Sequence, residues 1–169
     1  MTENKAARRD CGECDVCCRG WLKINTDEIK IPIGEACQHL SDVGCGIYTT
    51  RPENPCRTFF CGWAAEDSPL PEWMQPHNSR AIVLFNAIQW QGYTFDQVVP
   101  VGEEIPRKTI EWLLVFFKAH NRMAVIGKNE MQFNGKPSGK VMLMIFAPEP
   151  VKSQLEAWCQ KGNDLLNQK

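Results

Sequence analysis

The sequence has no long hydrophobic run and no excess of charge of one sign. Charged residues interrupt its apolar stretches, none of which approaches the roughly 18 residues needed to cross a bilayer. Its 19 basic residues are nearly balanced by 20 acidic ones, and no basic block occurs. We therefore expect no binding to membranes and no general binding to nucleic acid.

The start of the chain lacks the apolar core of a secretory signal. Residues 1–10 are polar and include Lys5, Arg8 and Arg9. This favours a cytoplasmic location, in which thiols stay reduced. A mature chain from which a signal had already been removed would leave an oxidising compartment as the alternative.

The common motifs of enzymes are missing from the sequence. It contains no glycine-rich phosphate loop, nucleophile elbow or zinc-protease helix, and no cluster of histidine with carboxylates. The Cys-x3-Cys-x2-Cys spacing of radical enzymes is also absent. Catalytic residues are therefore unknown, and the sequence leaves open whether the protein is an enzyme.

Cysteine, by contrast, is abundant and clustered. Eight of the nine cysteines lie in the first 61 residues, and only Cys159 lies near the end. Clustered cysteines form either disulfides or metal sites, and a reducing compartment favours metal. Cys159 falls on the apolar face of a predicted helix, so we expect it to pack in the core. The predicted metal ligands are Cys11, Cys14, Cys17, Cys18, Cys37, Cys45, Cys56 and Cys61.

The spacing of these eight cysteines suggests two four-cysteine sites. Cys11, Cys14 and Cys17 are each separated by two residues, which resembles the ladders that bind iron–sulfur clusters and favours a four-iron (4Fe-4S) cluster. The later four cysteines are dispersed, as in structural zinc sites, so Zn²⁺ is the alternative or the ion of a second site. The side chains of adjacent Cys17 and Cys18 should diverge and serve two sites, or one site and a packing role. The sequence does not choose which four cysteines belong together.

Three other residues are candidates for supporting roles. His39 could replace one thiolate, and the alternative is a solvated loop residue. Arg51 and Arg57 could donate hydrogen bonds to thiolate sulfurs and offset their negative charge. Alternatively, Arg51 begins a helix and Arg57 caps nearby carbonyl groups. No cofactor-binding residues are predicted beyond the metal ligands.

The N-terminal third resembles a known family. Cys11-x2-Cys14-x2-Cys17-Cys18 is followed by Cys37-Gln-His-Leu, Gly44-Cys45-Gly46-Ile47-Tyr48, Arg51-Pro52 and Cys56-Arg57-Thr58-Phe59. In this order the motifs closely resemble the CxxCxxCC, or YkgJ-like, family of zinc- or iron-chelating proteins, and the resemblance covers residues 11–63. It implies a bacterial, cytoplasmic, metal-binding protein, although the family has no settled activity. A similar cluster in flagellin lysine methylases is taken to hold an iron–sulfur cluster. Phe60-Cys61 departs from the pattern, which makes Cys61 the least supported ligand.

Beyond the cysteines, the sequence predicts an α+β fold. We expect a metal-stapled module at residues 1–66 and an α+β portion at residues 67–169, and the alternative is that the two pack together as one unit. Prolines between Gly62 and His77 indicate a linker or an ordered crossover. Behind it, strand and helix patterns give the order ββαββα, for which we expect an antiparallel sheet with both helices on one face. The expected elements are strands at 80–90, 93–101, 123–133 and 140–146, with helices at 106–121 and from 150 to about 162.

These patterns together predict a cytosolic metal-binding protein, either an accessory protein or a redox protein. It would act on a protein partner through contact or electron transfer. The alternative is an enzyme that uses the metal site as cofactor or scaffold and binds its substrate between the cysteine module and the sheet. A further alternative is a purely structural zinc protein whose C-terminal portion does the binding.

Overall fold

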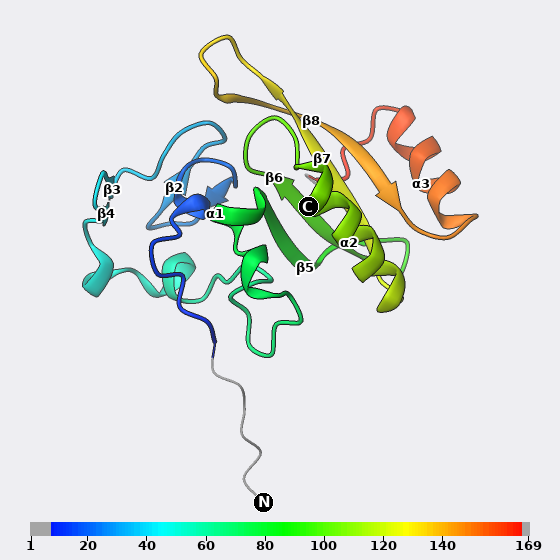
Figure 1. Ribbon diagram of the computed structural model, residues 1–169. Coiled ribbons are helices and arrows are strands. Elements are labelled where there is room, and N and C mark those ends of the chain that lie inside the picture. Colours follow the sequence, from blue (N-terminus) through cyan, green and yellow to red (C-terminus); the bar gives the residue numbers. More distant parts are fainter. Residues whose placement is uncertain (1–7, 167–169) are drawn as a thin grey trace, which may run out of the picture.

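A computed structural model describes residues 8–166 of the chain, and its largest element is a four-stranded sheet (Figure 1). In residues 8–166, one short α-helix precedes the sheet and two longer ones accompany it. The observed order after residue 80 is ββαββα, as the sequence predicts. The elements are α1 (Pro76–Ser79), β5 (Ala81–Trp90), β6 (Tyr93–Pro100), α2 (Arg107–Ala119), β7 (Met123–Met131), β8 (Pro137–Phe146) and α3 (Val151–Gln160). The α+β class is thereby confirmed.

The sheet is mixed, not purely antiparallel. Its order is β5-β6-β7-β8, with antiparallel pairs at both ends and a parallel pair of β6 with β7 in the middle. The expected antiparallel sheet is wrong at this pair because α2 forms a crossover. It returns the chain to the end of the sheet where β6 began, so that β7 runs in the same direction.

The two long helices cover opposite faces of the sheet. Ala124 and Ile126 of β7 pack in the cluster that contains Leu113 and Phe117 of α2. Val125, between them, packs with Leu155 of α3. Successive side chains of a strand point to opposite faces, so the prediction that both helices share one face is wrong.

Residues 8–66, called the cysteine-rich segment below, lie beside the sheet and contain little regular structure (Figure 1). Two pairs of two-residue strands, each antiparallel, are joined by tight turns and single helical turns. The strands are β1 (Ile24–Asn25), β2 (Lys30–Ile31), β3 (Leu40–Ser41) and β4 (Gly44–Cys45). The helical turns are Val16–Cys18, Tyr48–Thr50, Glu53–Arg57 and, after the segment, Glu72–Met74.

One hydrophobic cluster joins the cysteine-rich segment to the sheet. Val16 and Trp63 pack in it together with Ala81 of β5 and Phe117 of α2. The proline-containing segment between residues 62 and 77 is an ordered crossover, in which Leu70 and Met74 are fully buried in the same cluster. Whether residues 1–66 unfold as a separate domain stays a prediction.

Among residues 8–166, no helix is both long enough and apolar enough to cross a bilayer.

Candidate metal centre

All eight N-terminal cysteines line one cavity of about 900 Å³. The cavity is formed by the loops of the cysteine-rich segment and by the start of α1. All the cysteines are free thiols, and their exposure varies: Cys37 and Cys61 are buried, Cys11 is exposed, and the others are half-buried. The folded chain therefore brings together residues that are up to 50 positions apart in the sequence.

Four of the thiols gather where the segment meets the sheet. Cys14 and Cys17 pack against the hydrophobic cluster that includes buried Cys61. The Cys17 and Cys61 thiols are close enough to shift each other's pKa, upward for Cys17 and downward for Cys61, and Cys11 interacts electrostatically with both Cys61 and Cys14. We call Cys11, Cys14, Cys17 and Cys61 the first thiol set.

The other four thiols gather around a different hydrophobic cluster. Cys18 and Cys56 pack against buried Cys37 in a separate small cluster with Ile29 and Ile31. Cys18 interacts electrostatically with Cys37, Cys56 and also with Cys45 in β4. We call Cys18, Cys37, Cys45 and Cys56 the second thiol set.

The neighbouring residues Cys17 and Cys18 contribute to different sets. Cys17 packs with the cluster beside the sheet, whereas Cys18 packs with the small cluster of Ile29 and Ile31. They lie in a single helical turn, Val16–Cys18, in which successive side chains point in different directions. The divergence that the sequence predicts for this pair is confirmed.

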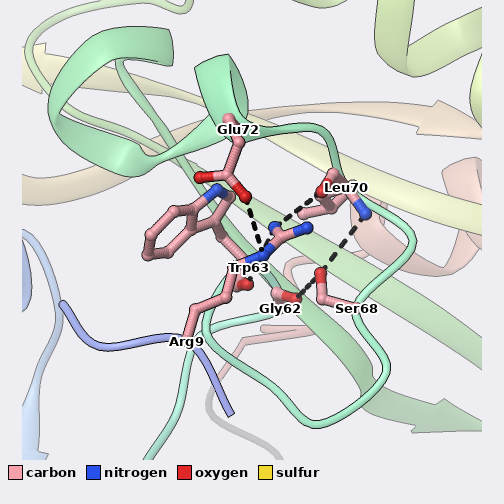
Figure 2. Close-up of polar contacts among 6 residues, drawn as sticks. All are labelled: Arg9, Gly62, Trp63, Ser68, Leu70 and Glu72. Carbon is pink, nitrogen blue, oxygen red and sulfur yellow. Dashed lines mark hydrogen bonds and ion pairs between the residues drawn. The ribbon is translucent and has the colours of Figure 1, made fainter. Parts of the chain in front are cut away.

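Arg9 joins the start of the described chain to the loop that follows Cys61 (Figure 2). Its guanidinium donates to the carbonyl oxygens of Leu70, at 2.6 Å, and Trp63, and forms an ion pair with Glu72 at 3.2 Å. Ser68 closes the same loop, since its hydroxyl donates to the Gly62 carbonyl. Arg9 lies two residues before Cys11, and Trp63 two residues after Cys61. These contacts therefore hold the first and last cysteines of the segment near each other.

Close backbone contacts position the second set. The Cys37 N–H donates to the Cys18 carbonyl at 2.8 Å, and the Gly34 N–H donates to the Gly20 carbonyl at 2.9 Å. Gly20 has a φ of +82°, and a Cβ there would lie 2.3 Å from the Glu35 carbonyl oxygen. Only glycine accommodates both the left-handed backbone and this close approach. Cys45 is brought in by the β3–β4 ladder, where it pairs with Leu40.

Burial opposes the ionisation of several of these thiols in the absence of a cation. Partial burial, followed by the neighbouring thiols, raises the pKa of Cys11 and of Cys18 to about 11 in each case. Cys61 differs from these thiols, because its neighbour Cys17 and the backbone N–H groups of Trp63 and Ala64 lower its pKa against the effect of burial. N–H groups directed at a sulfur are typical of sites that stabilise thiolates.

Two unpaired nitrogens line the same cavity. Among residues 8–166, Arg51 Nε and Trp63 Nε1 are the buried side-chain nitrogens or oxygens without a hydrogen-bond partner. The Arg51 guanidinium stacks on the Tyr48 ring at 3.8 Å from its centroid. Burial raises the pKa of Cys11 and of Cys56, and the charge of Arg51 partly offsets both increases, so Arg51 lies near both thiol sets. A buried N–H without an acceptor is costly, and a metal-bound sulfur would provide one.

The thiols do not themselves adopt the arrangement of a closed metal site. Within residues 8–166, no three His, Cys, Asp or Glu side chains converge so that they could hold an ion as they stand. The two sets are thus neighbourhoods of thiols. Their side chains and loops would have to close by a further step to coordinate a metal.

The supporting residues take different roles. Arg57 donates to the Thr49 carbonyl at 3.1 Å, which is the capping role that the sequence offered as one alternative. His39 lines the cavity, with its ring beside the Gln38 amide. Cys159 packs against the α3 cluster, as predicted. Arg9 was not found from the sequence, because an arginine before a cysteine ladder carries no motif of its own.

Comparison with models of protein families, with curated proteins and with solved structures gives no match to this chain. The resemblance to the CxxCxxCC family therefore stays a prediction that rests on the motif residues. What the fold and the cavity define is a class: an α+β protein with eight free thiols gathered beside a mixed sheet.

Proposed function

We propose that this protein binds metal through the thiolates of its eight N-terminal cysteines, as an iron–sulfur cluster, as zinc, or as one of each. The observation that carries the proposal is the gathering of all eight thiols around a single cavity. The protein acts in the cytosol as an accessory or redox protein and delivers its effect through a protein partner. Its ligand type, sulfur, is the one that iron–sulfur clusters and structural zinc prefer.

The electrostatics of the cavity support a bound cation. Neighbouring thiolates repel one another and are partly desolvated, so eight of them gathered without a counter-charge cost free energy. A divalent ion or an iron–sulfur core supplies that charge, and ligation then deprotonates the thiols. The orphaned Arg51 Nε supports the same conclusion, because a ligating sulfur would accept its hydrogen.

Anaerobic purification followed by metal and sulfide analysis tests the proposal. We expect two zinc ions per chain, or one or two four-iron clusters with matching sulfide. A brown protein whose visible absorption bleaches with dithionite would identify redox-active iron and exclude the zinc-only form. Protein that is folded, metal-free after anaerobic purification and unable to take up Zn²⁺ or reconstituted iron would contradict the proposal.

A second cavity favours one alternative function, an enzyme with its substrate between the cysteine-rich segment and the sheet. This cavity, of about 1320 Å³, is lined by Trp21 and Leu22 on one side and by Val125 and Leu143 of the sheet on another. Glu156 of α3 lies at its border. Its walls are largely apolar, as in sites for organic ligands, and its volume exceeds the several hundred Å³ that such sites usually enclose. In this alternative the metal site is a cofactor or a scaffold.

Ligand screening on metal-loaded protein tests this alternative. Leu143 is half-buried and lines only the second cavity of the two, so Leu143→Trp should fill that cavity and leave the metal content unchanged. We expect small molecules that shift amide signals of β7 and β8 in the unmodified protein to lose that effect in the variant. Binding that survives Leu143→Trp unchanged would contradict a substrate site here.

A further inference from the structure

We propose that the eight thiols form two separate four-thiolate centres, one from the first thiol set (Cys11, Cys14, Cys17 and Cys61) and one from the second (Cys18, Cys37, Cys45 and Cys56). This inference rests on the proposed metal binding and specifies it. The sequence left open which cysteines belong together, and the fold selects this division.

Packing is the first argument for the division. Three members of the first set, Cys14, Cys17 and Cys61, touch the hydrophobic cluster that reaches into the sheet. Three members of the second set touch a different cluster, which is built on Ile29 and Ile31. No cysteine belongs to both clusters. The two sets therefore pack against different apolar clusters, as expected for two centres and not for one shared cluster.

The placement of the remaining two thiols agrees with this division. Cys11 has Cys61 and Cys14 as its thiol neighbours, and the Gln75 amide holds its backbone carbonyl against the start of α1. Cys45 is a neighbour of Cys18 and Cys56, and its strand β4 pairs with β3, which follows Cys37 closely. Each set thus has four members and the ligand number of a tetrathiolate site.

Arg51 lies near a thiol of each set. It lies near Cys11 of the first set and Cys56 of the second, and it lines the common cavity. Two tetrathiolate centres that hold Zn²⁺ or oxidised four-iron clusters are both negatively charged. A single guanidinium near both would reduce the repulsion and donate to a sulfur of either centre.

Pairwise substitutions test the division directly. Zn²⁺ is titrated anaerobically into stripped, reduced full-length protein, against a chromophoric chelator, in three double variants. Two of these variants each remove two cysteines of a single set: Cys14→Ser with Cys61→Ser in the first set, and Cys37→Ser with Cys56→Ser in the second. The third crosses the sets: Cys14→Ser with Cys37→Ser. We expect each within-set variant to lose one of two tightly bound equivalents and the crossed variant to lose both. Cys159→Ser, outside both sets, is the matched control and should lose none.

Co²⁺ spectra of gentler single variants keep the test valid if a buried double substitution prevents folding. The variants are Cys11→Ser and Cys45→Ser, because Cys11 is exposed and Cys45 is half-buried. Each substitution should change the thiolate-to-cobalt absorption of one of two bound ions. The two changes should add when Cys11→Ser and Cys45→Ser are combined. If every double variant lost all metal, or if a crossed variant kept one full equivalent, the division would be wrong while metal binding itself stood. Absence of tight binding in the unmodified protein would instead refute the proposed function.

Discussion

Gly20 provides the sharpest test of how the backbone builds the second thiol set. Its φ is +82°, and a Cβ would lie 2.3 Å from the carbonyl oxygen and 2.6 Å from the nitrogen of Glu35. Both obstructing atoms are backbone, so they cannot swing aside as a flexible side chain would. Gly20→Ala should therefore move the loop that contains Glu35 and Cys37 away from Cys18, whose carbonyl accepts a hydrogen bond from the Cys37 N–H.

Gly92 is a matched control for this substitution. It has the same φ of +82°, but a Cβ there meets nothing within 4 Å. Gly92→Ala should cost about 1 kcal/mol, which is the penalty for a left-handed alanine. Gly20→Ala carries that penalty plus an overpacking cost of about 1–3 kcal/mol, and the rigid obstruction places it near the upper end. We expect the two variants to differ by about 3 kcal/mol.

Urea unfolding of both variants, at equal metal concentration, measures this difference. Metal analysis of the same samples should show loss of one equivalent in Gly20→Ala and none in Gly92→Ala. Equal unfolding free energies would refute the steric reasoning, since only the contact with Glu35 distinguishes the two sites. A destabilised Gly20→Ala protein with full metal content would instead separate the backbone contact from the second thiol set.

The remaining predictions concern charge and metal removal. Arg51→Gln should weaken Zn²⁺ binding by both thiol sets by about 10–100-fold, with partial recovery in Arg51→Lys; unchanged affinity would remove it from the site. Asp96→Ala should cost about 3 kcal/mol in urea, because it leaves Arg122 without its doubly bonded, 2% exposed partner; Glu111→Ala, at an exposed ion pair, should cost under about 1 kcal/mol. Stripping metal should abolish hydrogen-exchange protection within residues 21–63 and leave it unchanged in the sheet. Unchanged protection of residues 21–63 would show that this segment folds by packing alone.

The long elements were predictable from the sequence because periodicity records burial. The predicted strand at residues 80–90 corresponds to β5, and the predicted helix at 106–121 corresponds to α2, within two residues at each end. The helical spacing of Ile110, Leu113, Leu114 and Phe117 predicts one buried face, which is right in part: Leu113 and Phe117 are buried, Ile110 and Leu114 are half-buried, and Phe116 is buried as well. Such patterns depend on local spacing alone.

The position of the helices was harder to predict, although one signal existed. Ala124, Val125 and Ile126 are consecutive apolar residues in β7, and all three are buried. A strand that is apolar on both sides indicates a sheet that is covered on both faces, and a parallel pair connected through a helix. An antiparallel sheet with one solvated face would show alternation at these positions instead.

Membership of the thiol sets could not be predicted, because long-range contacts determine it. The clamp formed by Arg9, the approach of Gly20 to Glu35 and the packing of Cys37 on Ile31 each join distant parts of a segment without periodicity. No local pattern encodes such contacts. The divergence of Cys17 from Cys18 was the exception, since it follows from the geometry of adjacent residues.

The order of the two sets along the chain has a thermodynamic consequence. Every member of the second set lies between Cys17 and Cys61, so the second centre is nested inside the loop that the first centre closes. Without metal, joining Cys17 to Cys61 closes a loop of about 40 residues, but once Cys18 is held near Cys56 the effective loop is about seven residues. Loop-closure entropy then favours the second binding event by about 1.5 kcal/mol, or roughly tenfold in affinity.

This coupling is reciprocal, because each ligand must change the affinity for the other by the same factor. Destroying the second set with Cys37→Ser and Cys56→Ser should therefore weaken Zn²⁺ binding by the first set about tenfold. Cys14→Ser with Cys61→Ser should weaken the second set equally, and both factors come from the same chelator titrations. If each surviving set kept its full affinity, the loop would already be closed by packing before metal binds, with the Arg9 clamp and the Gly20 contact as the structural cause.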